Sequence, residues 1–290
     1  MTTAVLLIDC PDRKGLVAAI ANFLVDTYDA NILNADQHQD ASLGLFFMRV
    51  EFATDRPCDT ASFHAAFAPL AEQMKLNWTI TLQEQPLKVA IFVSHYLHCL
   101  ADLLHRHQTG ELPCTLSLII SNHESARPLA DFYGVPFHFT PVTPATGEAR
   151  EAARLALEQQ HLDLIAANNI DLIILARYMQ ILSPRFVDAH PLRIINVHHS
   201  FLPAFTGAKP YHAAFARGVK LIGATSHYVT AELDEGPIIE QDVTRVSQND
   251  QLPDLIQKGR DLERLVLSRA VRWHLAHRIL SYANKTVIFS

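Results

Sequence analysis

The sequence predicts an α/β protein of two modules, a small βαββαβ unit followed by an open, mostly parallel α/β sheet. Two observations predict this fold class. Before Pro86, apolar alternation and helical spacing follow one another in the order strand, helix, strand, strand, helix, strand. Beyond Pro86, short continuous apolar runs alternate with amphipathic stretches, which is typical of strands buried on both faces of a parallel sheet.

The first module is expected to fill residues 1–83. Strands are expected at residues 4–9, 31–38, 43–52 and 76–82, and helices at residues 16–28 and 60–74. A turn cluster at residues 11–15 separates the first strand from the first helix, and the polar residues 39–42 indicate a hairpin. This order of elements is the ferredoxin-like arrangement.

The second module is expected to follow a linker at residues 84–87 and to occupy residues 88–290. Strands are expected at residues 89–93, 116–120, 172–175, 193–197, 224–229 and 238–243, and helices at residues 95–107, 127–133, 147–168 and about 251–280. Open α/β sheets bind ligands at the carboxyl ends of their strands, so chemistry is expected there.

The composition excludes several functional classes. A net charge of −6 over 290 residues argues against nucleic acid as the main partner. No run of some eighteen apolar residues could span a membrane, and the N-terminus lacks the basic region of a signal peptide. The four scattered cysteines suit a reducing cytoplasm, and no metal site is expected because no cysteine or histidine cluster has zinc spacing.

Acyl-transfer chemistry is the hypothesis that the end of strand 193–197 suggests. Side chains alternate along a strand, so Asn196 and His198 point to the same side, where both can donate hydrogen bonds to an oxyanion. The alternative is a strand-capping asparagine beside a partly exposed histidine. Asp234, in an acidic turn between two apolar strands, could orient His198 and take a proton from water; the alternative is a solvated turn residue like Glu235.

Three spaced motifs together resemble the folate-dependent formyltransferases. They are N-x-H-x-S-x-L-P at residues 196–203, G-x-T-x-H-x-V at residues 223–229 and D-x-G-x-I-I at residues 234–239. The resemblance implies that Asn196, His198 and Asp234 are catalytic and that His227 supports the aspartate.

The segment at residues 175–183 resembles the loop with which this family holds the pterin ring. The resemblance implies 10-formyltetrahydrofolate as the substrate and no permanently bound cofactor. It also implies these folate contacts: Arg177, Met179, Gln180, Ile181 and Leu182 on one side, and Thr230 and Leu233 on the other. Without the resemblance, Met179, Ile181 and Leu182 would be plain core. Arg177 either shapes this pocket or forms an ordinary ion pair.

The first module resembles an ACT domain in residues 11–17 and 30–32. The resemblance implies an amino-acid effector, with glycine or methionine as the candidates. It assigns effector binding to Asp12, Arg13, Gly15 and Asn31. ACT modules commonly pair, so a homo-oligomer, either a dimer or a tetramer, is expected.

Water is the expected formyl acceptor. Transformylases that use a ribonucleotide follow the first strand with a glycine-rich phosphate loop, but residues 94–100 contain no glycine. An ACT module before a formyltransferase-like domain resembles the layout of the formyltetrahydrofolate deformylases, which implies hydrolysis to formate and tetrahydrofolate. Formate would then supply purine biosynthesis, and the reaction would balance the one-carbon folate pool. Two alternatives stay open: a transferase that uses a small amine, and a non-catalytic sensor. Neither His95 nor Lys209 has a role that can be assigned.

Overall fold

The structure is a computed structural model that describes residues 2–83, 86–142, 146–204 and 210–289. Two compact units divide the chain. One comprises Met1–Pro86 with Ala276–Tyr282 and Thr286–Ser290, and the other comprises Leu87–Leu275 with Ala283–Lys285. Residues 84 and 85 of the expected linker, and Lys209, lie outside the described residues. Within the described residues, no helix is both long enough and apolar enough to cross a membrane.

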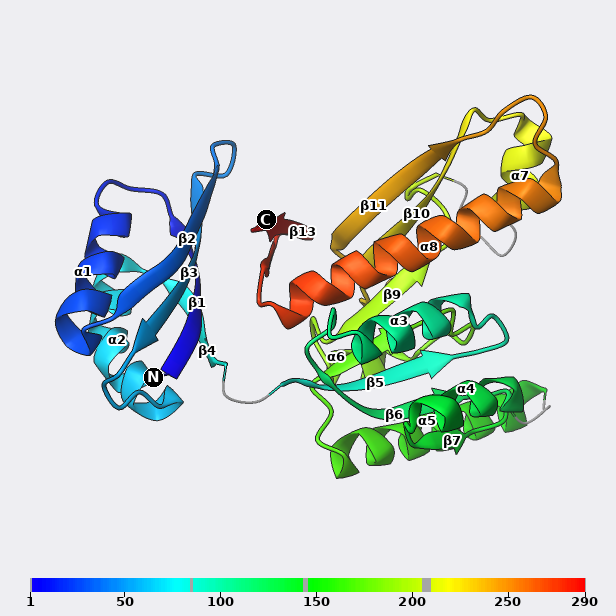
Figure 1. Cartoon of the computed structure of the whole chain (residues 1–290), viewed down its shortest axis with the longest axis horizontal. Helices are drawn as coiled ribbons and strands as arrows, with labels where there is room; N and C mark the ends of the chain where they lie inside the picture. The colour runs from blue at the N-terminus through cyan, green and yellow to red at the C-terminus, as the bar shows by residue number, and fades with distance from the viewer. Residues whose placement is uncertain (1, 84–85, 143–145, 205–209, 290) are drawn as a thin grey trace. The chain divides into compact units, whose positions relative to one another are not determined.

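The first unit contains a four-stranded antiparallel sheet with the strand order β2-β3-β1-β4. Its elements are β1 (Thr2–Pro11), α1 (Leu16–Tyr28), β2 (Asn31–Asp40), β3 (Leu45–Thr54), α2 (Thr60–Met74) and β4 (Asn77–Leu82). Both helices cover one face of the sheet, where Leu6, Phe52 and Phe63 are fully buried in a single core (Figure 1). The Asp59 carboxylate caps α2 by accepting a hydrogen bond from Ser62 N at 2.8 Å, so the helix begins where the sequence predicts.

The C-terminus differs from the expectation. The last long helix, α8 (Leu252–Leu275), ends five residues before the predicted residue 280, and the hairpin β12 (Ile279–Tyr282) and β13 (Lys285–Ile288) follows it. Leu280 and Val287 of this hairpin pack on Phe47 of β3, on the sheet face that the helices leave open. The second module was expected to extend to residue 290. In the structure, most of this hairpin belongs instead to the first compact unit.

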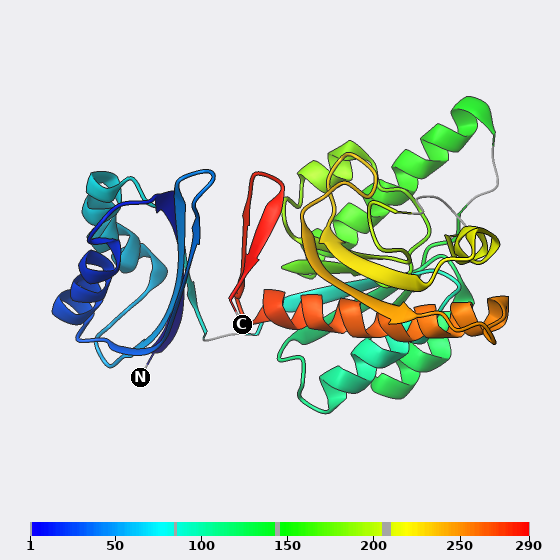
Figure 2. The same cartoon turned by 90° about the horizontal axis from the view of Figure 1, so that it is seen from above.

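The second unit contains a seven-stranded sheet with the strand order β11-β10-β9-β8-β5-β6-β7. Its strands are β5 (Lys88–Val93), β6 (Thr115–Ser121), β7 (Phe137–Phe139), β8 (Leu172–Leu175), β9 (Ile194–His198), β10 (Leu221–Tyr228) and β11 (Ile238–Arg245). Besides α8, its α-helices are α3 (His98–Gln108), α4 (Arg127–Tyr133), α5 (Gly147–Ala167), α6 (Pro184–Asp188) and α7 (Pro210–Arg217). Strands β5 to β9 run parallel, and β10 is antiparallel to both β9 and β11. The expected mostly parallel sheet is confirmed, and β7, α6 and α7 are additional to the sequence prediction. Figure 2 shows α8 running along this sheet.

The chain order places a ligand crevice between β5 and β8. From β5 the chain builds β6 and β7 on one side of β5, and α5 then returns it to β8 on the other side. Such a reversal opens a crevice at the carboxyl ends of the two strands. Ser94, which directly follows β5, accepts a hydrogen bond from Met179 N at 3.0 Å and donates to Asn122 Oδ1 at 2.8 Å. A hydrogen bond therefore joins Ser94, after β5, to Met179 in the segment after β8.

Candidate active site

A cavity of about 650 Å³ opens at the carboxyl ends of β8 and β9. Its walls come from residues 175–182, residues 196–203 and the loop at residues 229–236. All eleven predicted catalytic, supporting and folate-contacting residues line it: Asn196, His198, His227 and Asp234, with Arg177, Met179, Gln180, Ile181, Leu182, Thr230 and Leu233. Residues as far apart in the sequence as Leu175 and Gly236 therefore line one cavity.

Of the three apolar residues in question after β8, Met179 and Ile181 are not plain core, whereas Leu182 is partly buried and packs against the core. Met179 is 48 % exposed and Ile181 is 67 % exposed, and across the cavity Leu233 is 65 % exposed. Leaving such side chains in water is unfavourable, and an apolar wall with a few polar groups is typical of a small-molecule site. These walls have the character needed to cover a flat ring.

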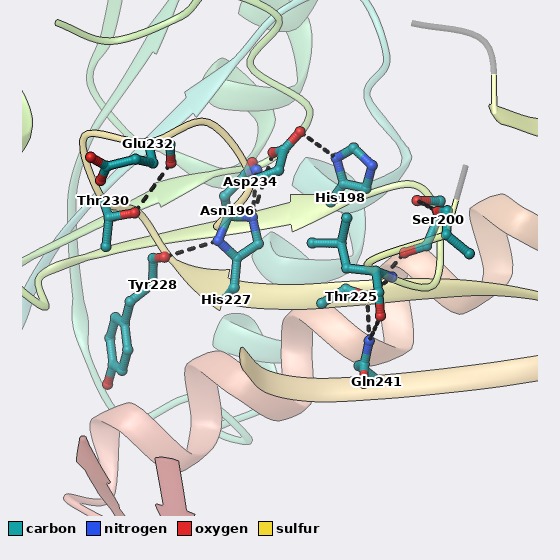
Figure 3. A network of polar contacts seen from close by, with 12 residues as sticks. Asn196, His198, Ser200, Thr225, His227, Tyr228, Thr230, Glu232, Asp234 and Gln241 are labelled. Carbon is teal, nitrogen blue, oxygen red and sulfur yellow. Dashed lines mark hydrogen bonds and ion pairs between the residues drawn. The ribbon is translucent and has the colours of Figure 1, made fainter. Parts of the chain in front are cut away.

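Strands β9 and β10 hold the polar centre of the cavity. Asn196 lies opposite His227 in the antiparallel register, and His198 lies opposite Thr225. The amide Nδ2 of Asn196 is 3.3 Å from Nε2 of His227 (Figure 3). The alternation expected from the sequence therefore places Asn196 and His198 along one wall of the cavity.

His227 fixes the orientation of the Asn196 amide. The side chain of His227 is 2 % exposed, and this burial lowers its pKa, so the neutral imidazole is favoured at neutral pH. Its Nδ1–H donates to Tyr228 O at 2.9 Å, which leaves Nε2 to accept a hydrogen bond from Asn196 Nδ2. One N–H of the Asn196 amide is thus engaged, and the second is available to a ligand in the cavity.

Asp234 approaches the same centre from the loop after β10. Its Oδ2 is 3.2 Å from Nδ1 of His198, and its Oδ1 is 3.7 Å from Nε2 of His227. The hydrogen bond from His198 lowers the pKa of the Asp234 carboxyl, although burial opposes this effect. The carboxylate is therefore ionised at neutral pH. Nε2 of His198 is buried and has no hydrogen-bond partner among the described residues, so its hydrogen-bonding capacity is unused.

A glycine two residues after Asp234 positions this loop. A Cβ at Gly236 would lie 1.8 Å from Tyr228 O, which no side chain tolerates. Asn284 also holds the loop, because its Nδ2 donates to Glu235 O at 2.9 Å. Asp234 itself has φ of 58°, a left-handed conformation that is uncommon outside glycine. The spacing D-x-G is therefore a packing requirement, which the sequence did not reveal.

Thr225, the threonine of the G-x-T-x-H-x-V motif, organises the wall next to His198, a role that the motif alone does not indicate. Its hydroxyl donates to Ser200 O at 2.9 Å and accepts from Leu202 N at 3.0 Å. Gln241 Nε2, from β11, donates to the same hydroxyl at 2.9 Å. Fully buried, Thr225 locks the turn after β9 onto β10.

A buried polar cluster around Glu263 of α8 was not foreseen either. The Glu263 carboxylate accepts hydrogen bonds from Tyr211 Oη at 2.6 Å and from His98 Nε2 at 2.8 Å, and Arg177 Nε lies 3.5 Å from it. Burial alone would raise the pKa of Glu263, but the hydrogen bond from His98 and the charge of Arg177 lower it overall.

The side chains of His98, Cys99 and Glu263 offer atoms that could bind a metal, and these atoms lie within 4.8 Å of one another. The spacing of these residues in the sequence does not indicate this grouping. Burial raises the pKa of the Cys99 thiol well above its usual range, which disfavours the thiolate that a metal requires.

The predicted effector residues do not form one group within the chain. Asp12, Arg13 and Gly15 follow the end of β1, where Pro11 lies beside Leu45 of β3. Asn31 begins β2 beside Ala53, eight residues further along β3. At roughly 3.3 Å per residue, about 26 Å of sheet separates the two positions. A site that uses both sets cannot form within a single chain.

The fold and the site define a formyltransferase-type domain. Residues 87–271 match the family model described as formyl transferase. The formyltetrahydrofolate deformylase of Synechocystis sp. is 53 % identical over 289 residues, covering 99 % of each chain. That of Bacillus subtilis is 49 % identical over 98 % of this chain and 93 % of its own. The crystal structure of a formyltetrahydrofolate deformylase from Pseudomonas syringae pv. tomato superposes with a TM-score of 0.93 at 46 % identity, over 100 % of this chain and 95 % of that chain. This chain belongs to the formyltetrahydrofolate deformylase family.

Proposed function

We propose that this protein hydrolyses 10-formyltetrahydrofolate to formate and tetrahydrofolate. One observation carries the proposal: Asn196, His198 and an ionised Asp234 line a cavity that also has exposed apolar side chains on two of its walls. An amide N–H and an imidazole N–H that border the same cavity suit an oxyanion that forms as a carbonyl becomes tetrahedral. The relatives named above support formyl-folate as the substrate.

In the proposed reaction, water attacks the formyl carbon of the substrate. The free N–H of Asn196 and the Nε2–H of protonated His198 donate to the developing oxyanion. Asp234 holds His198 through Nδ1 and accepts a proton from the attacking water. The carbon–nitrogen bond then breaks, the folate nitrogen takes up a proton, and formate and tetrahydrofolate are released.

The folate would lie between the two apolar walls. Met179 and Ile181 would cover one face of the pterin ring, and Leu233 and Thr230 would close the opposite side. Backbone groups of Gln180 and Leu182 would pair with the ring edge. Burial of the exposed apolar side chains would contribute to affinity at about 25 cal/mol per Å² of apolar surface covered.

Water is favoured as the acceptor because the segment after β5 carries aromatic and histidine side chains and no glycine-rich phosphate loop. The Arg177 guanidinium lies 5.1 Å from the ring centre of Tyr96, and His98 is hydrogen-bonded to the buried Glu263. In place of a glycine-rich loop with free backbone N–H groups, Ser94 is buried and tied to Met179 N. This arrangement favours a hydrolase and leaves transfer to a small amine as the competing outcome.

We also propose that the first unit is an ACT domain that regulates the reaction in response to glycine or methionine. The βαββαβ order and the antiparallel sheet support the ferredoxin-like arrangement of such a domain. Because Asn31 lies far from Asp12, Arg13 and Gly15, an effector site that uses all four requires a second copy of the chain. This requirement supports a homo-oligomer. The product formate would serve purine biosynthesis in the cytoplasm.

One assay tests the catalytic proposal. Purified protein is incubated with 10-formyltetrahydrofolate and no amine, and both formate and tetrahydrofolate are measured. Equal amounts of the two products are expected. A rate that appears only when an amine is added would replace the hydrolase by a transferase, and tight folate binding without turnover would indicate a sensor.

A further inference from the structure

A second, smaller cavity of about 290 Å³ adjoins the candidate active site. Arg177, Met179 and His199 line both cavities, so these three residues form a common wall. The remaining walls of the small cavity carry aromatic rings, Arg260 and the buried carboxylate of Glu263. A small molecule formed in the larger cavity therefore arises directly beside the smaller one.

Arg177 has unused hydrogen-bonding capacity in this common wall. The residue is 8 % exposed, yet its buried Nε and Nη1 have no hydrogen-bond partner among the described residues. Buried donors are normally hydrogen-bonded, and leaving a buried donor without an acceptor is costly. The backbone of Arg177 is also held at φ of 63°, a left-handed conformation that is uncommon for a bulky residue. Such strain often accompanies a side chain held for a function.

Glu263 does not satisfy Arg177. Its two carboxylate oxygens already accept hydrogen bonds from Tyr211 Oη and His98 Nε2, and the 3.5 Å separation from Arg177 Nε makes an ion pair without a hydrogen bond. Arg260 adds a second guanidinium, 5.6 Å from the ring centre of the same Tyr96 that Arg177 contacts. Two positively charged guanidinium groups and one negatively charged carboxylate line the small cavity, so its charge favours an anion.

We propose that Arg177 and the small cavity form a binding site for a small carboxylate, namely the formate that the reaction releases. The proposal rests on the proposed function. A guanidinium binds a carboxylate through a planar pair of N–H groups, and formate is the smallest carboxylate. Held there, formate lies away from the formyl position and leaves Asn196 and His198 free for the next substrate. The glutamyl tail of folate offers the same chemistry, so the experiment must separate the two sources.

Binding of sodium formate to the full-length protein, measured by calorimetry without folate, tests the site. Wild-type protein is expected to bind formate, and Arg177→Gln to bind it roughly tenfold or more weakly, because a charge-assisted pair is lost. Arg177→Lys, which keeps the charge but not the planar fork, is expected to fall between them. Arg264→Gln changes an arginine of α8 that pairs with Asp261, away from the cavity, and should bind as the wild type does. Thermal unfolding verifies that each variant is folded.

Several outcomes would overturn the proposal. Equal formate affinity in wild-type protein and both Arg177 variants would remove Arg177 from the site, and equal affinity for inorganic phosphate would make it a general anion site. If Arg177→Gln weakens binding of tetrahydrofolate but not of tetrahydropteroate, which lacks the glutamyl tail, Arg177 binds the tail. If the protein binds formate through Arg177 but does not hydrolyse 10-formyltetrahydrofolate, the proposed function is contradicted, whereas the proposed formate site is supported.

Discussion

Replacing Asp234 by asparagine tests the centre of the proposed mechanism. The change preserves the shape of the side chain but removes the charge that lies 3.2 Å from His198 Nδ1. The amide can still contact the imidazole, but it carries no charge and does not accept a proton from water. The variant should fold normally and lose most of its turnover.

The size of the loss follows from two contributions. A hydrogen bond to a charged group contributes about 1.5–3 kcal/mol, and at about 1.4 kcal/mol per factor of ten its loss lowers the rate roughly ten- to 150-fold. General base catalysis contributes roughly 10²- to 10⁴-fold. Because one carboxylate supplies both effects, they overlap, and the fall in kcat should be at least about a hundredfold.

The assay is formate release at saturating 10-formyltetrahydrofolate, measured over a range of pH. In the wild-type protein the pKa of Asp234 is lowered, so the ionised, active form persists at neutral pH and is lost only as the pH falls through that lowered pKa. This acid limb should be absent from the residual activity of Asp234→Asn. Glu235→Gln makes the same chemical change at an exposed neighbouring residue and should leave kcat within about twofold. A folded Asp234→Asn variant with half the wild-type rate would refute the assignment.

Three further changes test the groups around this carboxylate. Asn196→Ala removes one oxyanion donor and should lower kcat roughly a hundredfold or more with little change in stability, as formate release will show; near-normal turnover would refute its role. Gly236→Ala forces a Cβ against Tyr228 O and should lower the free energy of unfolding by about 1–3 kcal/mol, measured by urea denaturation; unchanged stability would contradict the packing argument. Asn284→Ala removes the hydrogen bond to Glu235 O and should lower kcat about two- to tenfold, as expected for a neutral bond that positions a loop. An unchanged kcat would mean that the loop holds its position without Asn284.

Local patterns were sufficient to predict much of the fold. The helices at Leu16–Tyr28 and Thr60–Met74 have the predicted bounds because each carries apolar residues at helical spacing. The strand at Leu172–Leu175 also has the predicted bounds, because it is a short continuous apolar run. The pairing of Asn196 and His198 on one wall follows from strand alternation alone. These features depend only on neighbouring residues.

The C-terminus shows where such patterns mislead. The prediction continued the last helix to residue 280, but the chain leaves the helix at Leu275 and His277 has φ of 50°. Leu280 and Tyr282 alternate as in a strand, and Ala283 and Asn284 both have positive φ, as a two-residue hairpin turn requires. The short alternating run was available in the sequence, but the long amphipathic helix before it obscured the change of period.

Contacts between distant residues could not be predicted from the sequence. Glu263 meets His98 across 165 residues, and neither residue belongs to a motif. The sequence predicts Arg177 in the loop after β8, but its place beside the second cavity and the lack of hydrogen bonds to Nε and Nη1 depend on how α8 packs against the sheet. Burial and pairing of this kind are tertiary properties, and only the structure reveals them.

A single carbonyl, Tyr228 O, links the two halves of the catalytic centre. It accepts the Nδ1–H of His227 and so leaves Nε2 to orient the Asn196 amide. The same oxygen packs against Gly236, and this contact sets the loop that carries Asp234. A side chain at position 236 would therefore displace the carboxylate and disturb the amide together. The spacing between His227 and the D-x-G turn is fixed because Tyr228 O must both accept the hydrogen bond from His227 and pack against Gly236.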